Sequence, residues 1–464
     1  MFAITYDFEV LVASLPFPCD GLADPTPAQA AREPSRGKPR LRIPCRDQAV
    51  MSWESLDQRL DPDSQARMVW SLVSLLDLNG WLKEIRAVEH HAGRDANDPR
   101  LLVALWVFAT LRGVGSSREL ERLCEQHLAY QWLCGGVSVN YHSLADFRTQ
   151  GGEKWDELLT QIVATLMVEK LVTMDRVAQD GMKVRAGAAK SSFRTDGTLE
   201  ELLSVAKEQV ETLKQWAQTN PDELSHRQRA AREHAAIERQ ERIENAKRQC
   251  DELRKKKQER DQGRKEKSSE ARGSATDPEA RNMRFPDGGY RPGYNVQFAT
   301  DVATGIVVGV DVTNEGTDAE QMPAMLDQLQ ERYDTLPGGM LVDGGFTSRD
   351  AIDSAEKRGC AVYGPVKDKA KQTKAGKDPF ARKPHDTDAT ADWRKRMGEE
   401  ASKAIYKLRA QTAEWVNALC RNRGLRQMPV RGLTKCRAVA TLYAIAHNFI
   451  QQGNVRAALA KGGN

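Results

Sequence analysis

The alternation of apolar and polar residues divides the chain into a helical first part, a highly charged middle part and a mixed second half. Over residues 64–151, apolar residues recur every three or four positions, which is the spacing of one buried helix face. Residues 99–113 begin at a proline, and Ser116 forms a capping-box pattern with Glu119 that starts a further helix. We therefore predict short helices joined by glycine-containing turns.

A second start signal of this kind occurs at Ser143, with Asp146 three residues later. Helical pairs of this type occur in helix-turn-helix proteins, but they are also common in proteins that bind no DNA. We predict that residues 64–165 form an all-α domain, which is either a DNA-binding domain or a packing domain. Residues 1–63, whose first 50 positions are rich in proline, are predicted to be an extended arm followed by an irregular segment.

The charged middle part, residues 196–272, has two helical patterns. Between residues 199 and 217, apolar positions alternate in steps of four and three residues, as in a heptad seam. An Asn-Pro pair ends this pattern, and a similar one follows over residues 236–253. We predict an inserted antiparallel coiled-coil hairpin, with residues 262–280 flexible. Such a hairpin would serve in oligomerisation or in clamping DNA, or it would act as a spacer.

The second half has the composition of strands that alternate with helices. Strand patterns precede and follow the inserted hairpin, and two of them are separated by a short turn that predicts a β-hairpin. A charged linker is predicted after the last strand. The predicted strands cover residues 173–184, 294–301, 305–312, 338–346 and 360–366, the predicted helices 317–333 and 348–359, and the predicted linker 366–397.

Three strands, a helix, a strand, a helix, a strand and a final helix follow one another in the order of the ribonuclease H-like fold. In that arrangement the first and fourth strands are neighbours, so Asp180 and Asp343, each before a glycine at a predicted strand end, would lie together. A later helix supplies Glu414. We predict an α/β fold with a mixed sheet, in which residues 173–190 and 281–460 form a ribonuclease H-like catalytic domain.

Each of these acids also has a purely structural interpretation. An Asp-Gly pair is commonly a turn after a strand, and Glu414 lies among basic residues, where it could pair with Arg409 or Arg421. The strand order is what connects the three acids. Their oxygens suit Mg²⁺, with Mn²⁺ as a substitute, and two such ions can promote an in-line displacement at phosphorus.

Charge is distributed unevenly, although the formal net charge is only +4. Residues 404–464 hold ten Lys or Arg residues and a single acid, which favours a polyanionic partner over a merely solvated surface. Eight scattered cysteines without a C-x-x-C pair are interpreted as reduced thiols, and the absence of a long apolar run argues against a membrane span. We therefore expect a cytoplasmic protein. The basic residues expected to contact DNA phosphates are Arg423, Arg426, Arg431 and Lys435.

Several segments, taken together and in this order, resemble the insertion-sequence transposases of the DDE type. They include SSRELERLCEQHLAYQWLCGGVSVNYHSLADFR, QDGMKVRAGA, DPEARNMRFPDGGYRPGYNVQFATD, LVDGGFTS and YKLRAQTAEWVNALCRNRG. The resemblance implies that the metal ligands are Asp180, Asp343 and Glu414. It also implies that Tyr406, Arg409 and Arg421 contact DNA phosphate and steady the site. The chain departs from the family pattern at Met182, Trp415 and Arg421.

The activity implied by this resemblance is DNA transposition. The enzyme would cleave phosphodiester bonds at the ends of the element and transfer the 3′-OH strand to target DNA. Its partners would be double-stranded DNA and further copies of the chain, as a homodimer or higher oligomer on nucleoid DNA. Two alternatives remain open: a ribonuclease H-like nuclease without strand transfer, and a domesticated DNA-binding protein without catalysis.

Overall fold

The computed structural model describes residues 53–85, 95–219, 225–261 and 270–462. Contacts divide the chain into residues 1–53 and 54–464, and the elements below belong to the second unit. The predicted proline-rich arm lies almost entirely outside the described residues, as does the predicted break between the two helices of the insert.

The first part of this unit consists of helices, as the spacing of its apolar residues predicts. Helix α5 (Pro99–Leu111) is the central one, because nearly all of its residues are buried and apolar residues cover its whole circumference. Trp106 in α5 donates from Nε1 to the carbonyl oxygen of Leu144 at 2.9 Å and so ties α5 to α8. The surrounding helices are α2 (Leu56–Arg59), α3 (Gln65–Ser74), α4 (Asn79–Leu82), α6 (Ser117–Gln126), α7 (Leu128–Cys134), α8 (Tyr141–Gln150) and α9 (Gly152–Val168).

Side-chain caps decide where these helices begin. Ser116 accepts a hydrogen bond from the backbone N–H of Glu119 at the start of α6, as predicted. Helix α8 begins at Tyr141, because Asn140 caps it by accepting from the backbone N–H of Ser143. The start predicted at Ser143 is therefore wrong, since asparagine caps a helix as well as serine does and occurs three residues earlier.

A mixed six-stranded sheet forms the second half of the unit. Its order is β4-β5-β1-β7-β8, and β6 also pairs with β5. Strand β5 is antiparallel to its partners, whereas β1, β7 and β8 are parallel to one another. The strands are β1 (Arg176–Arg185), β4 (Arg281–Arg284), β5 (Tyr290–Asp301), β6 (Val307–Thr313), β7 (Gly339–Leu341) and β8 (Ala361–Tyr363).

Strands β1 and β7 are neighbours, as predicted for the first and fourth strands, although the inserted hairpin separates them in the sequence. They pair in parallel, with Ala178 opposite Leu341. Asp343 follows β7 by two residues, but Asp180 does not end its strand, so that part of the prediction is wrong. Strand β1 continues to Arg185, because its second half still pairs with β5 beyond the last residue of β7.

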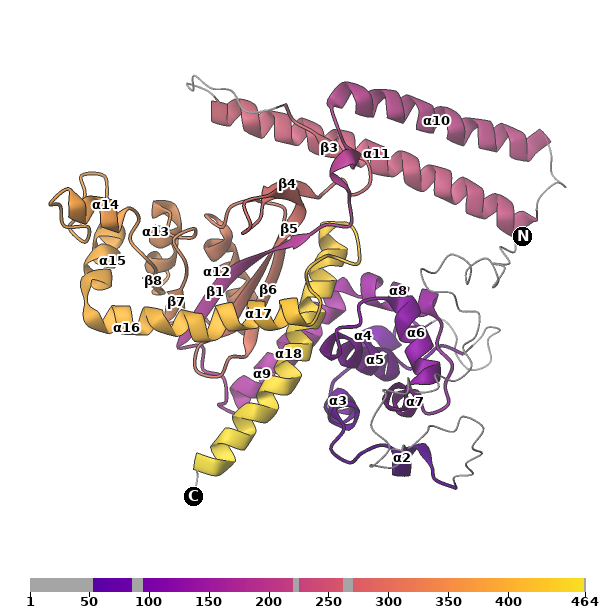
Figure 1. Cartoon of the computed structure of the whole chain (residues 1–464), viewed down its shortest axis with the longest axis horizontal. Coiled ribbons are helices and arrows are strands. Elements are labelled where there is room, and N and C mark those ends of the chain that lie inside the picture. The colour runs from indigo at the N-terminus through magenta and orange to yellow at the C-terminus, as the bar shows by residue number, and fades with distance from the viewer. Residues whose placement is uncertain (1–52, 86–94, 220–224, 262–269, 463–464) are drawn as a thin grey trace, which may run out of the picture. The chain divides into compact units, whose positions relative to one another are not determined.

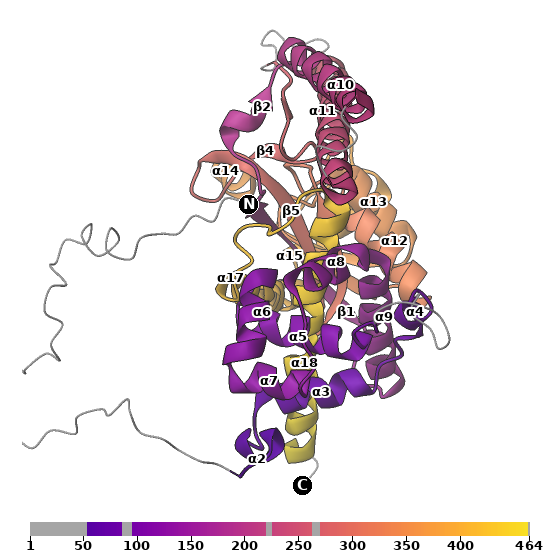
Figure 2. The same ribbon diagram turned by 90° about the vertical axis from the view of Figure 1, so that its right-hand side faces the viewer.

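Helices cover both faces of the sheet. On one face, α12 (Gln321–Tyr333) packs so closely on β6 that a Cβ atom at Gly309 would lie 2.5 Å from the sulfur of Met325. On the other face, Asn448 of α18 (Leu433–Gly462) hydrogen-bonds both the N–H and the C=O of Val307. Helix α18 lies between the sheet and the helical first part (Figures 1 and 2). The remaining helices are α13 (Arg349–Lys357), α14 (Lys369–Lys374), α15 (Asp388–Gly398), α16 (Glu400–Arg409) and α17 (Trp415–Asn422).

The inserted segment forms two long helices, α10 (Asp196–Thr219) and α11 (His226–Asp261), which lie side by side away from the sheet (Figure 1). Leu199 packs with Ala246 and Cys250 in a small apolar cluster separate from the main core. A short 3₁₀ turn, Lys190–Ser192, precedes the insert. A two-stranded ribbon at its base joins it to the sheet through β2 (Phe193–Arg194) and β3 (Gly273–Ser274).

Part of the segment predicted to be flexible, residues 262–280, is ordered. Strand β3 lies within it, and the buried carboxylate of Asp277 accepts a 2.6 Å hydrogen bond from the hydroxyl of Tyr294 and a second one from the N–H of Gly432. The prediction followed the local composition, which contains no information on these distant partners.

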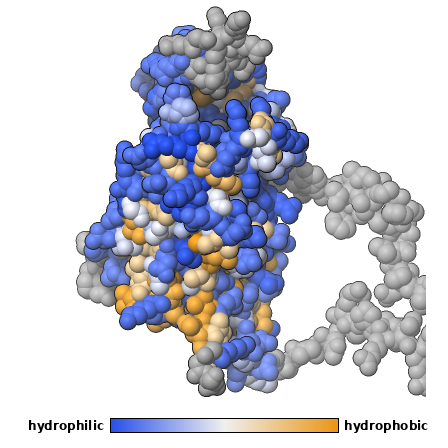
Figure 3. Space-filling model, turned by 90° about the vertical axis from the view of Figure 1, so that its left-hand side faces the viewer, coloured by the Kyte–Doolittle hydropathy of each residue, from blue (hydrophilic) through white to orange (hydrophobic). Residues whose placement is uncertain are grey.

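The face in Figure 3 is mostly hydrophilic, with hydrophobic side chains gathered toward its lower end. Leu75 and Val168 are among the most exposed large apolar side chains of the described residues. No helix in the described part of the chain combines the length and apolarity needed to cross a membrane.

Candidate active site

Asp180 lies in the middle of β1, opposite Phe298 of β5 and two residues beyond Ala178, the last residue of β1 that pairs with β7. Both of its carboxylate oxygens have partners: Oδ1 accepts from Nη2 of Arg409 at 2.8 Å, and Oδ2 accepts from Nδ2 of Asn417 at 2.9 Å. Burial raises the pKa of Asp180, Arg409 opposes this rise, and the nearby charge of Asp343 adds to it. Asp180 is therefore a mostly buried anion that depends on its neighbours to stay ionised.

Asp343 lies at the carboxyl end of β7, in the turn that follows the strand. Its Oδ1 accepts a 2.7 Å hydrogen bond from the N–H of Gly345, which fixes the side chain across the turn. The parallel pairing of β1 and β7 brings this turn to Asp180, and the two charges are close enough to influence each other. The structure thus brings together the two aspartates that the sequence predicts as partners.

Glu414 occupies an unusual helical turn. Residues Ala410–Glu414 form a π-helical turn between α16 and α17. Within an α-helix, two residues five positions apart point in directions roughly 140° apart, so they do not meet. Here the wider turn lets Nη1 of Arg409 reach Oε1 of Glu414 at 2.7 Å. Such π turns are frequent at functional sites, and this one connects Glu414 to Asp180 through the guanidinium of Arg409.

The three carboxylates supply the hard oxygen donors that a divalent cation prefers. Among the residues that the structure describes, however, no group of three or more acidic, histidine or cysteine side chains is placed to hold a metal ion. The pairing of Arg409 with both Asp180 and Glu414 explains this, because the guanidinium lies where these two acids could otherwise share a cation. The carboxylate oxygens are suitable ligands for a divalent ion, provided that Arg409 breaks its ion pairs with Asp180 and Glu414.

Two segments of the chain match known protein families. Residues 268–449 match the family described as Transposase DDE domain, and residues 54–150 match the family described as Transposase domain (DUF772). The chain belongs to the insertion-sequence DDE transposases. Members of this family act on DNA and generally use divalent metal ions. Searches of curated proteins and of solved structures gave no match.

Only one of the two matched segments contains any of the three candidate ligands. Asp343 and Glu414 lie within the DDE segment, whereas Asp180 lies between the two matched segments. Asp180 enters the site only through the strand pairing of β1 with β5 and β7. Its place beside Asp343 is therefore a property of the fold of this transposase and not of the matched sequence alone.

Tyr406 on α16 precedes Glu414 in the sequence of the transposase, and Arg421 on α17 follows it. Tyr406 is half-buried, and its pKa is raised mainly by burial, with further contributions from Asp343 and Glu414 that Arg409 opposes. It thus lies near the acids, whereas the side chain of Arg421 is exposed on the last turn of α17. Arg421 is therefore free to reach a ligand outside the protein.

The loop between α17 and α18, together with the first turn of α18, carries the other basic residues. Arg426, Arg431 and Lys435 are exposed, whereas Arg423 is only partly exposed and its Nη1 atom is buried without a hydrogen-bond partner among the described residues. The loop is held beside the end of β1, because the N–H of Arg185 donates to the carbonyl oxygen of Arg426. The basic side chains therefore project from a fixed backbone.

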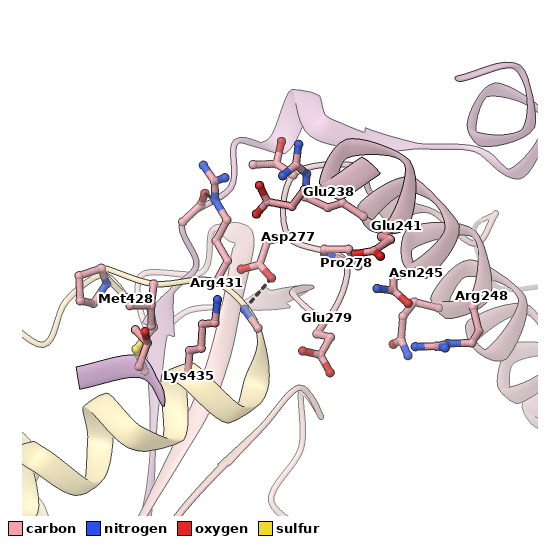
Figure 4. A pocket seen from close by; sticks show the side chains of 18 residues that line it. Glu238, Glu241, Asn245, Arg248, Asp277, Pro278, Glu279, Met428, Arg431 and Lys435 are labelled. Atoms are coloured by element: carbon pink, nitrogen blue, oxygen red, sulfur yellow. Dashed lines mark hydrogen bonds between the residues drawn. The ribbon is translucent and has the colours of Figure 1, made fainter. Parts of the chain in front are cut away.

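A cavity of about 720 Å³ separates this loop from helix α11 of the insert. Arg431 and Lys435 line it on one side, and Asn245 and Arg248 of α11 lie on the other (Figure 4). Acidic residues line the cavity as well, and one of them, Asp277, already accepts a hydrogen bond from the N–H of Gly432. The insert thus comes close to the basic loop of the transposase.

Several residues that contact the site are not among its predicted members. Asn417 binds Asp180 from α17, and Lys183 forms an ion pair with Asp318 at 3.6 Å. An aspartate at position 318 is predicted either to cap the following helix or to approach the metal ions, with capping favoured. It does not cap α12, which begins three residues later without a side-chain cap, and its carboxylate turns toward β5. The available signal was the polar side chains at alternate positions of an otherwise buried strand, Asn295 and Gln297.

Proposed function

We propose that this transposase cleaves phosphodiester bonds at the ends of its element and joins the freed 3′-OH to target DNA, using Mg²⁺ or Mn²⁺. Asp180, Asp343 and Glu414 would hold the ions, on a sheet of the ribonuclease H-like type. Bound there, the ions would activate the attacking oxygen and stabilise the leaving one. The observation that carries this proposal is the parallel pairing of β1 with β7, which places Asp180 near Asp343.

The protein's own side chains would bind and orient the DNA. Arg421, Arg426, Arg431 and Lys435 are exposed cations on or beside one loop, which suits contact with successive phosphates. Arg409 can donate two parallel hydrogen bonds. It can therefore leave its carboxylate partners and make the same number of hydrogen bonds to a phosphate. The helical first part would add contacts to the element ends, and a second copy of the chain would bring the two ends together on nucleoid DNA in the cytoplasm.

The proposal is tested by replacing Asp343 with Asn and measuring nicking of an end-sequence duplex with Mg²⁺. We expect nicking to fall by on the order of 10³-fold, because a ligand of the ions loses its charge. Asp350→Asn, an exposed aspartate seven residues later, is the matched control and should nick normally. DNA binding should persist in both variants and weaken steeply with salt. Undiminished nicking by Asp343→Asn would overturn the metal role.

A second assay separates transposition from simple nuclease activity. A pre-cut end with a free 3′-OH is incubated with a target plasmid, and joined products are counted. A transposase joins the strands, whereas a nuclease without strand transfer leaves the target intact. A protein that binds DNA without catalysis shows neither nicking nor joining.

A further inference from the structure

Asp318 lies on the face of β1 opposite to Arg409. Successive side chains of a strand point to opposite faces, so Gly181 and Lys183 face away from the side that Asp180 faces. On this second face, Oδ1 of Asp318 accepts from Nδ2 of Asn295 at 2.6 Å and from Nε2 of Gln297 at 2.7 Å. These two amides fix the carboxylate against the strands.

Gly181, directly after Asp180, makes room for this carboxylate, which also lies near the turn that holds Asp343. A Cβ atom at Gly181 would lie 2.5 Å from Oδ1 of Asp318, closer than two such atoms can approach. A Cβ atom at Gly345 would lie 2.9 Å from Oδ1 of Asp343 and 3.6 Å from Oδ2 of Asp318. Asp318 therefore contacts the strand position next to Asp180 and also the turn that holds Asp343.

The cation beside Asp318 is Lys183, and more than one carboxylate acts on its charge. Nζ of Lys183 is 3.6 Å from Oδ1 of Asp318 and is buried without a hydrogen-bond partner among the described residues. Burial lowers the pKa of Lys183, and the charges of Asp318, Asp343 and Asp180, in that order, oppose this effect. After Asp318, the two candidate metal ligands, Asp343 and Asp180, are the anions whose charges act most strongly on this ammonium group.

We propose that Asp318 is a positioning residue for the site: it holds the Lys183 ammonium group away from Asp180 and Asp343, which stay available to a divalent cation. The inference rests on the metal role in the proposed function. This role also accounts for the two amide hydrogen bonds to Asp318. They keep the carboxylate in one position, so that the Lys183 ammonium group beside it stays in place as well. An ammonium group released toward Asp343 would compete directly with a bound cation.

The test measures Mn²⁺ binding to the full chain without DNA, by the loss of the free Mn²⁺ signal in electron paramagnetic resonance. We expect Asp318→Asn to weaken binding at least about tenfold, and the double variant K183M/D318N to return to within about threefold of the wild type. Lys183→Met alone should bind at least as well as the wild type, because it removes a competing positive charge. Asp350→Asn serves as the control for a lost surface carboxylate.

Each result decides the matter. The inference is overturned if Asp318→Asn binds Mn²⁺ normally, if the double variant stays as weak as the single one, or if Lys183→Met binds less. Weak binding by the double variant would mean that Asp318 acts as a ligand or a structural support. If Asp318→Asn does not fold, which a circular dichroism melt reveals, the other two variants still decide.

The wild type and Asp180→Asn separate this inference from the proposed function. Mn²⁺ binding that Asp180→Asn abolishes and Asp318→Asn leaves intact would keep the metal role and remove only the role of Asp318. A wild-type chain that binds no Mn²⁺ would overturn both.

Discussion

The two faces of strand β1 each place a cation near Asp180, but the two cations have different partners. On the α17 face, Arg409 pairs directly with two candidate metal ligands, Asp180 and Glu414. On the α12 face, Lys183 pairs with Asp318, which belongs to no proposed ligand set. A positive charge near an acidic site can therefore compete for the site or be held away from it, according to which carboxylate the fold supplies as its partner.

The largest effect on stability is expected from Arg409→Gln. Asp180 is mostly buried, and Arg409 is the one cation among the described residues that forms an ion pair with it, so its removal leaves an uncompensated charge, at a cost of about 3 kcal/mol or more. Since the competing guanidinium is gone, added Mn²⁺ should raise the melting temperature of the variant more than that of the wild type. Both effects are measured by thermal unfolding with and without Mn²⁺.

Lys407→Gln is the control for Arg409→Gln, because Lys407 is an exposed cation on the same helix. It should change neither the stability nor the response to Mn²⁺ by a measurable amount. If Arg409→Gln behaved like Lys407→Gln, the two faces of β1 would not differ in the way described.

The α17 face also depends on a neutral histidine. The ring of Trp415, next to Glu414, packs edge-on against His447, and burial lowers the pKa of His447 to about 4. Because the unfolded chain takes up this proton near pH 6.5 and the folded chain does not, stability should fall as the pH drops from about 6.5 to about 4. The loss is up to about 3 kcal/mol.

His447→Gln should remove this part of the pH dependence, while its amide can still donate to the carbonyl oxygen of Gly305. Urea unfolding of both proteins across this pH range gives the difference directly. An equal loss of stability in both proteins would show that the histidine is not its source.

Gly181→Ala tests the α12 face. The added methyl group would overlap both the carboxylate of Asp318 and the side-chain amide of Gln297 that holds it, so we expect a loss of about 2 kcal/mol in the free energy of unfolding. Gly316→Ala is the matched control, since the nearest atom to its Cβ would be 3.9 Å away. Equal stability of the two variants would mean that Asp318 can move aside, which would weaken its proposed role.

The smallest effect on stability is expected from Glu414→Gln. The side chain of Glu414 is 53% exposed, against 16% for Asp180, although both pair with Arg409. Because solvent screens the exposed pair, its loss should cost less than about 1 kcal/mol. Nicking should nevertheless fall steeply, since the proposed ligand loses its charge. A large loss of stability would instead point to a structural ion pair.

Much of the fold follows from local patterns. Helix α5, the β5–β6 hairpin and helices α12 and α13 lie where apolar spacing and turn residues predict them. The errors have specific causes: Asn140 replaced the expected serine as a cap, and β1 continued past Asp180 because β5 is longer than β7. In both cases a partner that the local pattern did not include decided the boundary.

Residue type and spacing alone indicate the three candidate acids, the succession of strands and helices from β5 to β8, and the concentration of basic residues near the C-terminal end. They did not predict strand β4, nor helices α14 and α15, which occupy the predicted charged linker. Only the tertiary structure decided that Arg409 lies between Asp180 and Glu414, that a π turn makes this contact, and that Asp318 holds Lys183 on the opposite face. These contacts join residues far apart in the chain or depend on a change of helical register. Their energies therefore exist only once the strands and helices have packed.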